Sequence, residues 1–272
     1  MEHVHVLSLG AGTQSSAMAL MAAHGDLPKP DYIIFSDTGW EPKHVYKWLE
    51  ELKAELAKFD MEVITVSNGN IYEDVLNSIE TGGRVASLPY YTKDPETGEK
   101  GITMRQCTGD YKIKPINKKI REILGYRKGQ RVKEKVHMWK GITTDEIARI
   151  KSSQERWIEF DYPLFYKNMD RLNAINYVKR KMGKIPPKSS CIGCPFHNND
   201  MWLDIKKNYP DEFQEAVEFD RKIRDNPKYR SKLYLHKSCL PLDEVDLQED
   251  QTTLADFLGD DFENDCSGMC GI

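Results

Sequence analysis

The sequence predicts an α/β protein built on a doubly wound parallel sheet. Apolar, β-branched runs alternate with helix-period segments through the first half of the chain. The first of these runs ends in a turn of small and hydroxyl-bearing residues, Ser8–Ser16. Strands that alternate with helices form parallel sheets, because each helix carries the chain back to the starting edge. Ligands of such sheets bind at the carboxyl ends of the strands, so we expect a site at the rim that carries Ser8.

The expected elements follow this alternation in order. The segment 43–59 shows the helical period most clearly, with apolar residues at Val45, Trp48, Leu49, Leu52 and Leu56. Residues 81–101, rich in glycine and proline, predict a long loop. We expect a nucleotide-binding domain over 1–230 and a helical, cysteine-rich and acidic extension over 231–272. The other expected elements are strands at 4–9, 32–35, 62–66 and 136–142, an extended piece at 161–165, and helices at 14–24, 71–79, 114–124, 170–182, 199–208 and 211–225.

Composition places the chain among soluble globular proteins. Its 272 residues are 39% hydrophobic and 30% charged, and no apolar run approaches the roughly 18 to 20 residues of a membrane span. The N-terminus lacks the pattern of a signal peptide. We therefore expect a cytoplasmic protein with no membrane partner. In that compartment its cysteines predict ligands or reactive thiols before disulfides.

Charge is distributed unevenly along the chain. The net charge is −4, yet residues 112–135 are dominated by lysine and arginine, against only Glu122 and Glu134. Residues 243–265 carry acidic residues and no lysine or arginine. Two interpretations of the basic stretch stay open: it faces nucleotide phosphates or a nucleic acid, or it is a solvated helix face.

The turn at Ser8–Ser16 has the composition of a phosphate-binding loop. Its glycines permit positive φ and a close approach of the backbone, and the next helix points its positive end at the same place. It fits neither the Walker nor the dinucleotide-binding pattern, and an ordinary tight turn is the alternative. The expected phosphate ligands are the backbone amides of Gly10, Ala11, Gly12 and Thr13 and the hydroxyls of Ser8 and Ser15.

Several segments together resemble the phosphoadenylyl-sulfate (PAPS) reductase-like branch of the ATP-pyrophosphatase (PP-loop, adenine nucleotide α-hydrolase) superfamily. The turn is similar to that superfamily's S-G-G-x-D-S loop, although Gly12 replaces the acidic residue. The other matches are Asp37–Glu41 to D-T-G-x-E, Cys107–Pro115 to a cysteine followed by K-x-x-P, Gly141–Arg149 to G-x-R-x-x-E-S with Thr143 in place of the arginine, and Tyr162–Leu164 to Y-P-L. The resemblance covers about residues 4–200.

The resemblance implies a nucleotide, ATP or PAPS, bound at the rim with Mg²⁺. Asp37 and Lys112 are the implied catalytic residues: Asp37 binds Mg²⁺ or the ribose, and Lys112 neutralises phosphate charge. Gly141 would border the nucleotide. The alternative for Asp37 is that it only caps a helix or forms a turn. The alternative for Lys112 is a solvated lysine on the protein surface. The following residues keep two interpretations each: Trp40 stacks on adenine or belongs to the core, and Asp145 and Glu146 hold Mg²⁺ or cap a helix.

The pair Cys191-x-x-Cys194, followed by Pro195, is typical of a metal-binding turn. The resemblance adds Cys107, since matching cysteines in thiolating relatives ligate a [4Fe–4S] cluster. Cys239 is the expected fourth ligand, with His197 and the C-terminal cysteines as alternatives. A structural Zn²⁺ is the alternative metal.

Cys266 and Cys270 lie in a glycine-containing C-terminus. PAPS reductases carry a nucleophilic cysteine in such a tail, which Met269-Cys270-Gly271 resembles in part. Cys270 is therefore a predicted catalytic nucleophile. A persulfide shuttle between the two cysteines and metal ligation remain alternatives.

Three functions follow from these features. The favoured one is a sulfur-transfer enzyme that cleaves ATP to AMP and pyrophosphate, activates an acceptor and thiolates it with the help of an iron–sulfur cluster; the acceptor would be tRNA, DNA or a small molecule. The second is a PAPS or adenylyl-sulfate reductase using Cys270. The third is a non-catalytic, zinc-stabilised nucleotide- or nucleic-acid-binding module. The expected protein partners are a sulfur donor or a thioredoxin-like reductant, and a homodimer stays open.

Overall fold

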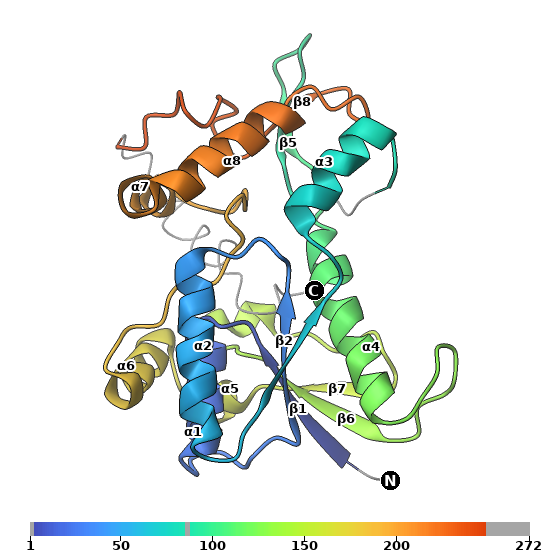
Figure 1. Ribbon diagram of the computed structural model, residues 1–272, viewed down its shortest axis with the longest axis vertical. Helices are drawn as coiled ribbons and strands as arrows, with labels where there is room; N and C mark the ends of the chain where they lie inside the picture. The colour runs from blue at the N-terminus through green and yellow to red at the C-terminus, as the bar shows by residue number, and fades with distance from the viewer. Residues whose placement is uncertain (1–2, 85–87, 249–272) are drawn as a thin grey trace.

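The computed structural model describes residues 3–84 and 88–248 and centres on a five-stranded parallel sheet (Figure 1). The strand order is β3-β2-β1-β6-β7, and every neighbouring pair is parallel. This arrangement confirms the predicted fold class. The strands are β1 (His3–Leu9), β2 (Tyr32–Asp37), β3 (Val63–Ser67), β6 (Lys135–Trp139) and β7 (Ile158–Asp161).

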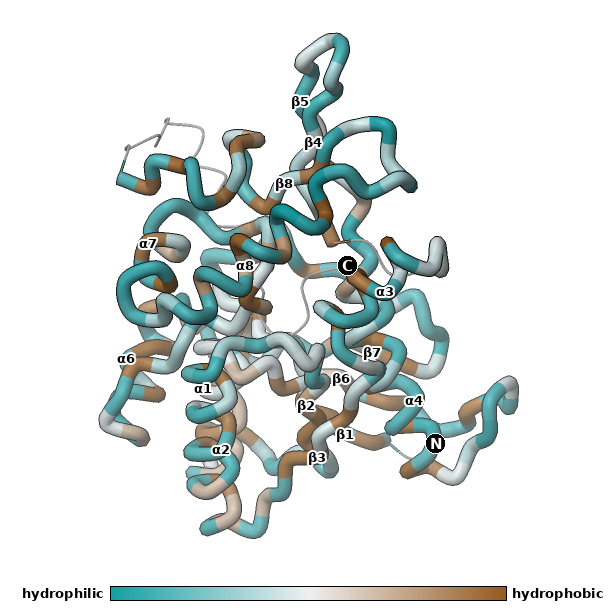
Figure 2. Tube along the Cα trace, turned by 45° about the horizontal axis from the view of Figure 1, so that its top comes forward, coloured by the Kyte–Doolittle hydropathy of each residue, from teal (hydrophilic) through white to brown (hydrophobic). Residues whose placement is uncertain are grey.

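Helices cover both faces of the sheet. One core lies between the sheet and α1 (Thr13–Ala23), α2 (Lys43–Ala57) and α6 (Arg171–Met182). The small side chains of α1, such as Ala17 and Ala19, are fully buried and let that helix pack closely. On the other face, α4 (Lys114–Ile123) buries Ile116 and Ile120 against the sheet. Hydrophobic residues accordingly run along β1 and β2 in Figure 2.

A second core lies beyond the carboxyl ends of the strands. It is formed by α3 (Ile71–Thr81), α7 (Asn199–Asn208), α8 (Pro210–Ile223) and an antiparallel sheet of order β5-β4-β8. The strands of that sheet are β4 (Tyr91–Lys93), β5 (Lys100–Ile102) and β8 (Lys232–Tyr234). Trp202 and Phe219 are its largest fully buried side chains, and Cys107 and Cys191 pack against it. The rim of the parallel sheet is thus enclosed between two cores.

The expected C-terminal extension falls partly within this second core. Residue 232 begins β8, and Leu242, Val245 and Leu247 are buried in the core. Residues 249–272, including Cys266 and Cys270, lie outside the described residues.

Two short helices carry sequence motifs to the rim. A π-helical segment, η1 (Thr108–Ile113), follows Cys107 and leads directly into α4. A 3₁₀ segment, η2 (Thr144–Arg149), follows β6. A short α5 (Pro163–Tyr166) begins just after β7.

Two predicted segments differ from the structure. The expected loop 81–101 contains the strand β4 and the start of β5, paired across a turn in which Gly98 has φ of +73°. These strands are short and mostly polar, so no hydrophobic alternation indicated them. The expected extended piece 161–165 is split, because Pro163 starts α5, where its missing N–H costs nothing.

No helix among residues 3–84 and 88–248 is long and apolar enough to cross a membrane.

Candidate functional site

The phosphate-type loop connects β1 to α1 with one strained residue. The glycines of the loop permit positive φ, yet Ala11 adopts it, with φ of 57°, whereas Gly12 is extended with φ of −94° and ψ of −174°. A non-glycine residue in the left-handed region costs about 1 kcal/mol, and such strain gathers at ligand sites. Gly12 lies next to Ser189, where an added Cβ would make an ordinary contact of 3.4 Å with that side chain.

The loop leaves polar groups unpaired at the start of α1. The N-cap residue, Gly12, offers no side chain to the first-turn N–H groups of this helix. The Ser8 hydroxyl is buried and has no hydrogen-bond partner among the described residues. Ser15 behaves differently: its Oγ accepts the Gly10 N–H at 3.1 Å and donates to the Gly12 carbonyl at 3.3 Å. Ser15 therefore holds the loop in shape.

The turn from Gly141 to Arg149 packs directly on this loop. A Cβ at Gly141 would lie 2.9 Å from Gln14 Cβ and 3.2 Å from the Ser15 amide nitrogen, so glycine is needed for the approach. Gln14 Nε2 donates to Glu146 Oε2 at 3.3 Å. Glu146 also forms a capping box with Thr143 and an ion pair with Arg149.

These contacts separate the two carboxylates. Glu146 belongs to the capping box of η2, as one of its two interpretations expected. Asp145 does not cap η2 but accepts the N–H of Arg171, the first residue of α6, at 3.0 Å.

Asp37 ends β2 at the same rim. Its Oδ1 accepts the Gly39 N–H at 2.8 Å and the Tyr46 hydroxyl at 2.7 Å, while Oδ2 accepts no hydrogen bond from the described residues. Burial, followed by the hydrogen bond to Asp37, raises the pKa of Tyr46 well above its usual value. Tyr46 therefore stays a proton donor that orients Asp37. One carboxylate oxygen forms the turn, and the other remains for a ligand.

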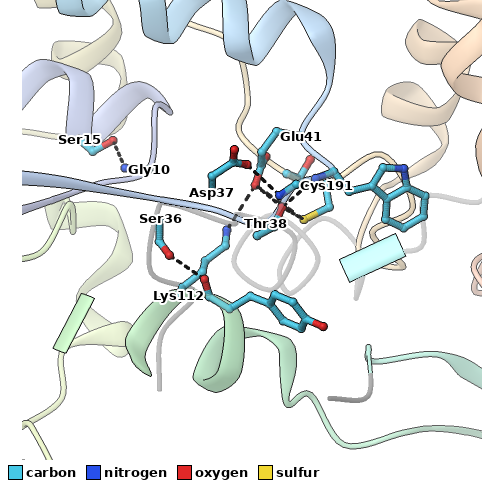
Figure 3. Close-up of polar contacts among 12 residues, drawn as sticks. Gly10, Ser15, Ser36, Asp37, Thr38, Glu41, Lys112 and Cys191 are labelled. Atoms are coloured by element: carbon cyan, nitrogen blue, oxygen red, sulfur yellow. Dashed lines mark hydrogen bonds and ion pairs between the residues drawn. The ribbon is translucent and has the colours of Figure 1, made fainter. Parts of the chain in front are cut away.

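A thiol, a carboxylate and a lysine meet next to Asp37 (Figure 3). Cys191 Sγ lies 3.2 Å from Thr38 Oγ1 and 3.7 Å from Glu41 Oε1. Thr38 donates to Glu41 Oε1 at 3.2 Å, and Lys112 Nζ lies 4.0 Å from the same oxygen. Glu41 and Lys112 are both buried. We call these four residues the Cys191 network; it joins the D-T-G-x-E segment, η1 and the cysteine pair.

Two further cysteines lie close to this network. The Cys194 N–H donates to the Cys191 carbonyl at 3.1 Å in a tight turn. Burial is the main cause that raises the pKa of both thiols, and Cys107 is close enough to contribute for Cys194. Cys239 is not brought to this group: its thiol donates to the Thr92 carbonyl at 3.6 Å. The structure thus places Cys191 and Cys194 in one turn, with Cys107 in their neighbourhood and Cys239 apart from them.

The described residues form no ready-made metal centre. Among residues 3–84 and 88–248, no group of three His, Cys, Asp or Glu side chains is arranged to hold a metal ion. Ligation of an iron–sulfur cluster or of Zn²⁺ by Cys107, Cys191 and Cys194 therefore stays a prediction.

Trp40 belongs to the core, as one of its two interpretations expected. Its ring packs on Phe219 and Tyr72, with centroids 4.6 and 5.1 Å away. Gly193 lies against the same ring, where an added Cβ would come within 2.1 Å of Trp40. The Ile192 N–H also donates to the Trp40 carbonyl at 3.0 Å. Trp40 therefore anchors the cysteine turn beside β2.

His197 does not join the cysteines. Its Nε2 lies 2.8 Å from Ser190 Oγ, and its ring packs edge-on to Trp202. Burial lowers the pKa of His197 to about 3, so the ring is neutral. It lines a separate cavity with His44 and Tyr209.

The sequence left three site residues without a role. Thr38 and Glu41 stand inside the D-T-G-x-E match, and only their contacts to Cys191 show what they do. Lys140 directly precedes Gly141 at the end of β6, and burial lowers its pKa to about 7. Its Nζ lies 4.1 Å from the centre of the Phe160 ring. A lysine that follows an apolar strand is the signal that could have found it.

Comparisons with known proteins give little beyond the fold. No family model and no curated protein matches the chain. A search of solved structures finds similarity to the U34-tRNA thiolase NcsA from Methanococcus maripaludis, solved with its [4Fe-4S] cluster. The identity is 13%, the alignment covers 81% of this chain and 71% of that chain, and the TM-score is 0.38. At these values the similarity carries no functional argument.

Proposed function

We propose that this chain is a nucleotide-dependent sulfur-transfer enzyme of the PP-loop type. It cleaves ATP to AMP and pyrophosphate, activates an acceptor carbonyl and replaces its oxygen by sulfur. The observation that carries the proposal is the Cys191 network, in which a cysteine sulfur lies within 4 Å of a carboxylate at the nucleotide rim. That carboxylate is in turn paired with a buried lysine.

The rim supplies the nucleotide half of the reaction. The uncapped start of α1 and the strained turn at Ala11 form a nest of backbone amides for phosphates. Ser8 adds a buried hydroxyl that has no partner among the described residues. Oδ2 of Asp37 accepts no hydrogen bond from the described residues and would bind Mg²⁺, which phosphate transfer from ATP requires. Lys112 would stabilise the negative charge that develops on the phosphates.

The cysteines supply the sulfur half. Glu41 Oε1 accepts the thiol proton of Cys191. Burial and, after it, the charge of Glu41 raise the pKa of this thiol, whereas the charge of Lys112 lowers it. Cys107, Cys191 and Cys194 would hold a [4Fe–4S] cluster, which when bound would present sulfur for transfer.

The reaction balances without an oxidant or reductant. The acceptor carbonyl oxygen attacks the α-phosphorus of ATP, and pyrophosphate leaves. Hydrosulfide then forms the new C–S bond, the C–O bond breaks, and the oxygen departs with AMP. The hydrosulfide proton passes to a base or to water.

The test is a metal and turnover measurement on anaerobically purified protein. We expect about four irons with matching sulfide per chain, and pyrophosphate release from ATP that depends on Mg²⁺. Cys191→Ser should lose most of the iron. Cys239→Ser is the matched control and should keep it, because Cys239 lies apart from the other three thiols.

Two results contradict this function. Zinc alone, or an iron content that does not change in Cys107→Ser, Cys191→Ser and Cys194→Ser, rules out the cysteine assignment. Sulfite release from PAPS that requires Cys270 and no ATP would instead identify a reductase.

A further inference from the structure

A second cavity, separate from the phosphate loop, adjoins the segment that carries Cys107. It measures about 550 Å³ and lies between η1, the start of α4, the rim of β6 and β7, and the loop after η2. Gln106 and Thr108, on either side of Cys107, line it. None of the residues of the phosphate loop does. A molecule held there would therefore lie beside the sulfur centre without occupying the nucleotide site.

The wall of this cavity combines apolar side chains with hydrogen-bonding groups. Met138, Ile158 and the ring of Phe160 form the apolar part. Asn117 and Gln154 add amides, which both donate and accept hydrogen bonds. This combination suits a planar heterocycle with polar edges, such as an unstacked nucleobase.

The mouth of the cavity is basic on balance. Arg84, Arg105 and Lys114 line it, against Asp110 and Glu155. Asp110 forms an ion pair with Lys114, and Glu155 accepts the Trp157 indole N–H at 2.9 Å, so both carboxylates already have partners.

The basic surface continues from the mouth along α4. We call Lys114, Lys118, Arg127, Lys128 and Arg131 the α4 basic strip; all five are exposed. Lys118 is 80% exposed, and its ion pair with Glu122 spans 4.0 Å. The helix is about 15 Å long at 1.5 Å per residue, and the loop after it extends away from the body of the protein (Figure 1).

We propose that the acceptor is a nucleic acid strand, with an unstacked, carbonyl-bearing base in the cavity beside Cys107 and its phosphate backbone on the α4 basic strip. A small molecule would fill the cavity and leave the strip unused, and a simple polyanion would bind the strip and leave the cavity unused. A nucleic acid uses both. This inference rests on the proposed function for the chemistry at the base, but its binding claim stands on the cavity and the strip.

Binding is tested with fluorescently labelled single strands of 15 nucleotides, one of RNA and one of DNA, and with an abasic DNA of the same length. Lys118→Glu/Lys128→Glu should weaken binding of the base-bearing strands at least tenfold. It should also lower the slope of log affinity against log salt by about 1.4. The control Lys179→Glu/Lys207→Glu makes the same charge change at exposed lysines of α6 and α7 and should leave binding unchanged.

The outcomes distinguish RNA from DNA as the acceptor, and binding of a base from a general attraction of charges. Tighter binding of RNA or of DNA names the natural acceptor class. Equal binding of the abasic strand, or equal loss in the control variant, overturns the inference because it leaves only a general attraction of charges. Ser152→Trp, placed on an exposed loop at the cavity, should abolish ATP-dependent thiolation of the bound strand.

Failure of the proposed function gives a different result. In that case the strip and the bases still determine binding, but no variant and no wild-type protein releases pyrophosphate from ATP. Pyrophosphate release with a nucleic-acid affinity that the strip variant does not change would overturn the acceptor and leave the function intact.

Discussion

Two turns meet at the rim of the parallel sheet and differ in how they treat their polar groups. The loop Gly10–Ser15 leaves the start of α1 uncapped and follows Ser8, whose buried hydroxyl has no partner among the described residues. The turn Gly141–Arg149 pairs its polar groups internally, through the capping box of Thr143 and Glu146. The two are in contact, since Gly141 packs on Gln14.

The difference separates a binding loop from a supporting one. Unpaired buried groups cost stability, and a protein keeps them where a ligand pairs them. Paired groups contribute stability and hold their neighbours in position. This criterion agrees with the proposal that the first turn binds phosphate and the second fixes its position.

The largest expected effect comes from breaking the paired turn. Glu146→Ala removes the cap of η2 and the partner of Arg149, whose side chain is only 12% exposed. Loss of one member of a buried ion pair costs about 3 kcal/mol of unfolding free energy, which chemical denaturation measures. Glu146→Ala/Arg149→Ala should recover part of that loss. The control is Asp145→Ala at the exposed neighbouring residue, which should lower the unfolding free energy by about 1 kcal/mol. If Glu146→Ala and Asp145→Ala lower it equally, Glu146 has no special role.

Lys140 directly precedes the paired turn, and burial lowers its pKa from 10.5 to about 7. Between these two values the folded protein binds fewer protons than the unfolded chain, so each unit of falling pH costs the folded state about 1.4 kcal/mol. Lys140→Met removes this cost. Relative to wild type, the variant should gain about 2.5 kcal/mol of unfolding free energy from pH 9 to pH 7, and the gain should level off below pH 6.

Denaturation series at several pH values test this expectation. Lys118→Met, which removes an exposed lysine, is the control and should show no such pH dependence. A Lys140→Met curve parallel to wild type would mean that Lys140 is charged in the folded protein throughout this range.

The sequence predicts the sheet and the rim because both follow from local patterns. Apolar runs, the periodic segment 43–59 and the turn after β1 each lie within a few residues. The sequence did not predict the hairpin of β4 and β5. Backbone pairing between the two strands forms it, and their side chains show no hydrophobic alternation. The left-handed residue of the loop did not follow from composition either, since Gly10 and Gly12 permit positive φ but Ala11 adopts it.

Contacts between distant segments were the hardest part of the site to predict. Cys191 meets Thr38 and Glu41 from more than a hundred residues away, and no local pattern indicates which thiol faces the carboxylate. Cys239 is a cysteine like the other expected ligands, so the sequence does not distinguish it from them. Packing of the second core places it next to β4 instead.

Ser8 and Ser15 give the finest test of the comparison, because the two serines of one loop should respond in opposite directions. Ser8→Ala removes a buried hydroxyl that has no partner among the described residues, so the unfolding free energy should stay constant or rise by up to about 1 kcal/mol. Its affinity for ATP should fall about tenfold, the effect of one hydrogen bond to a charged phosphate. Ser15→Ala breaks the bonds to Gly10 and Gly12 and should lower stability by about 1 kcal/mol. Calorimetric titration with ATP and thermal unfolding of both variants measure the two quantities. If Ser8→Ala destabilises the protein as Ser15→Ala does and binds ATP like wild type, the loop is a tight turn and the phosphates bind elsewhere.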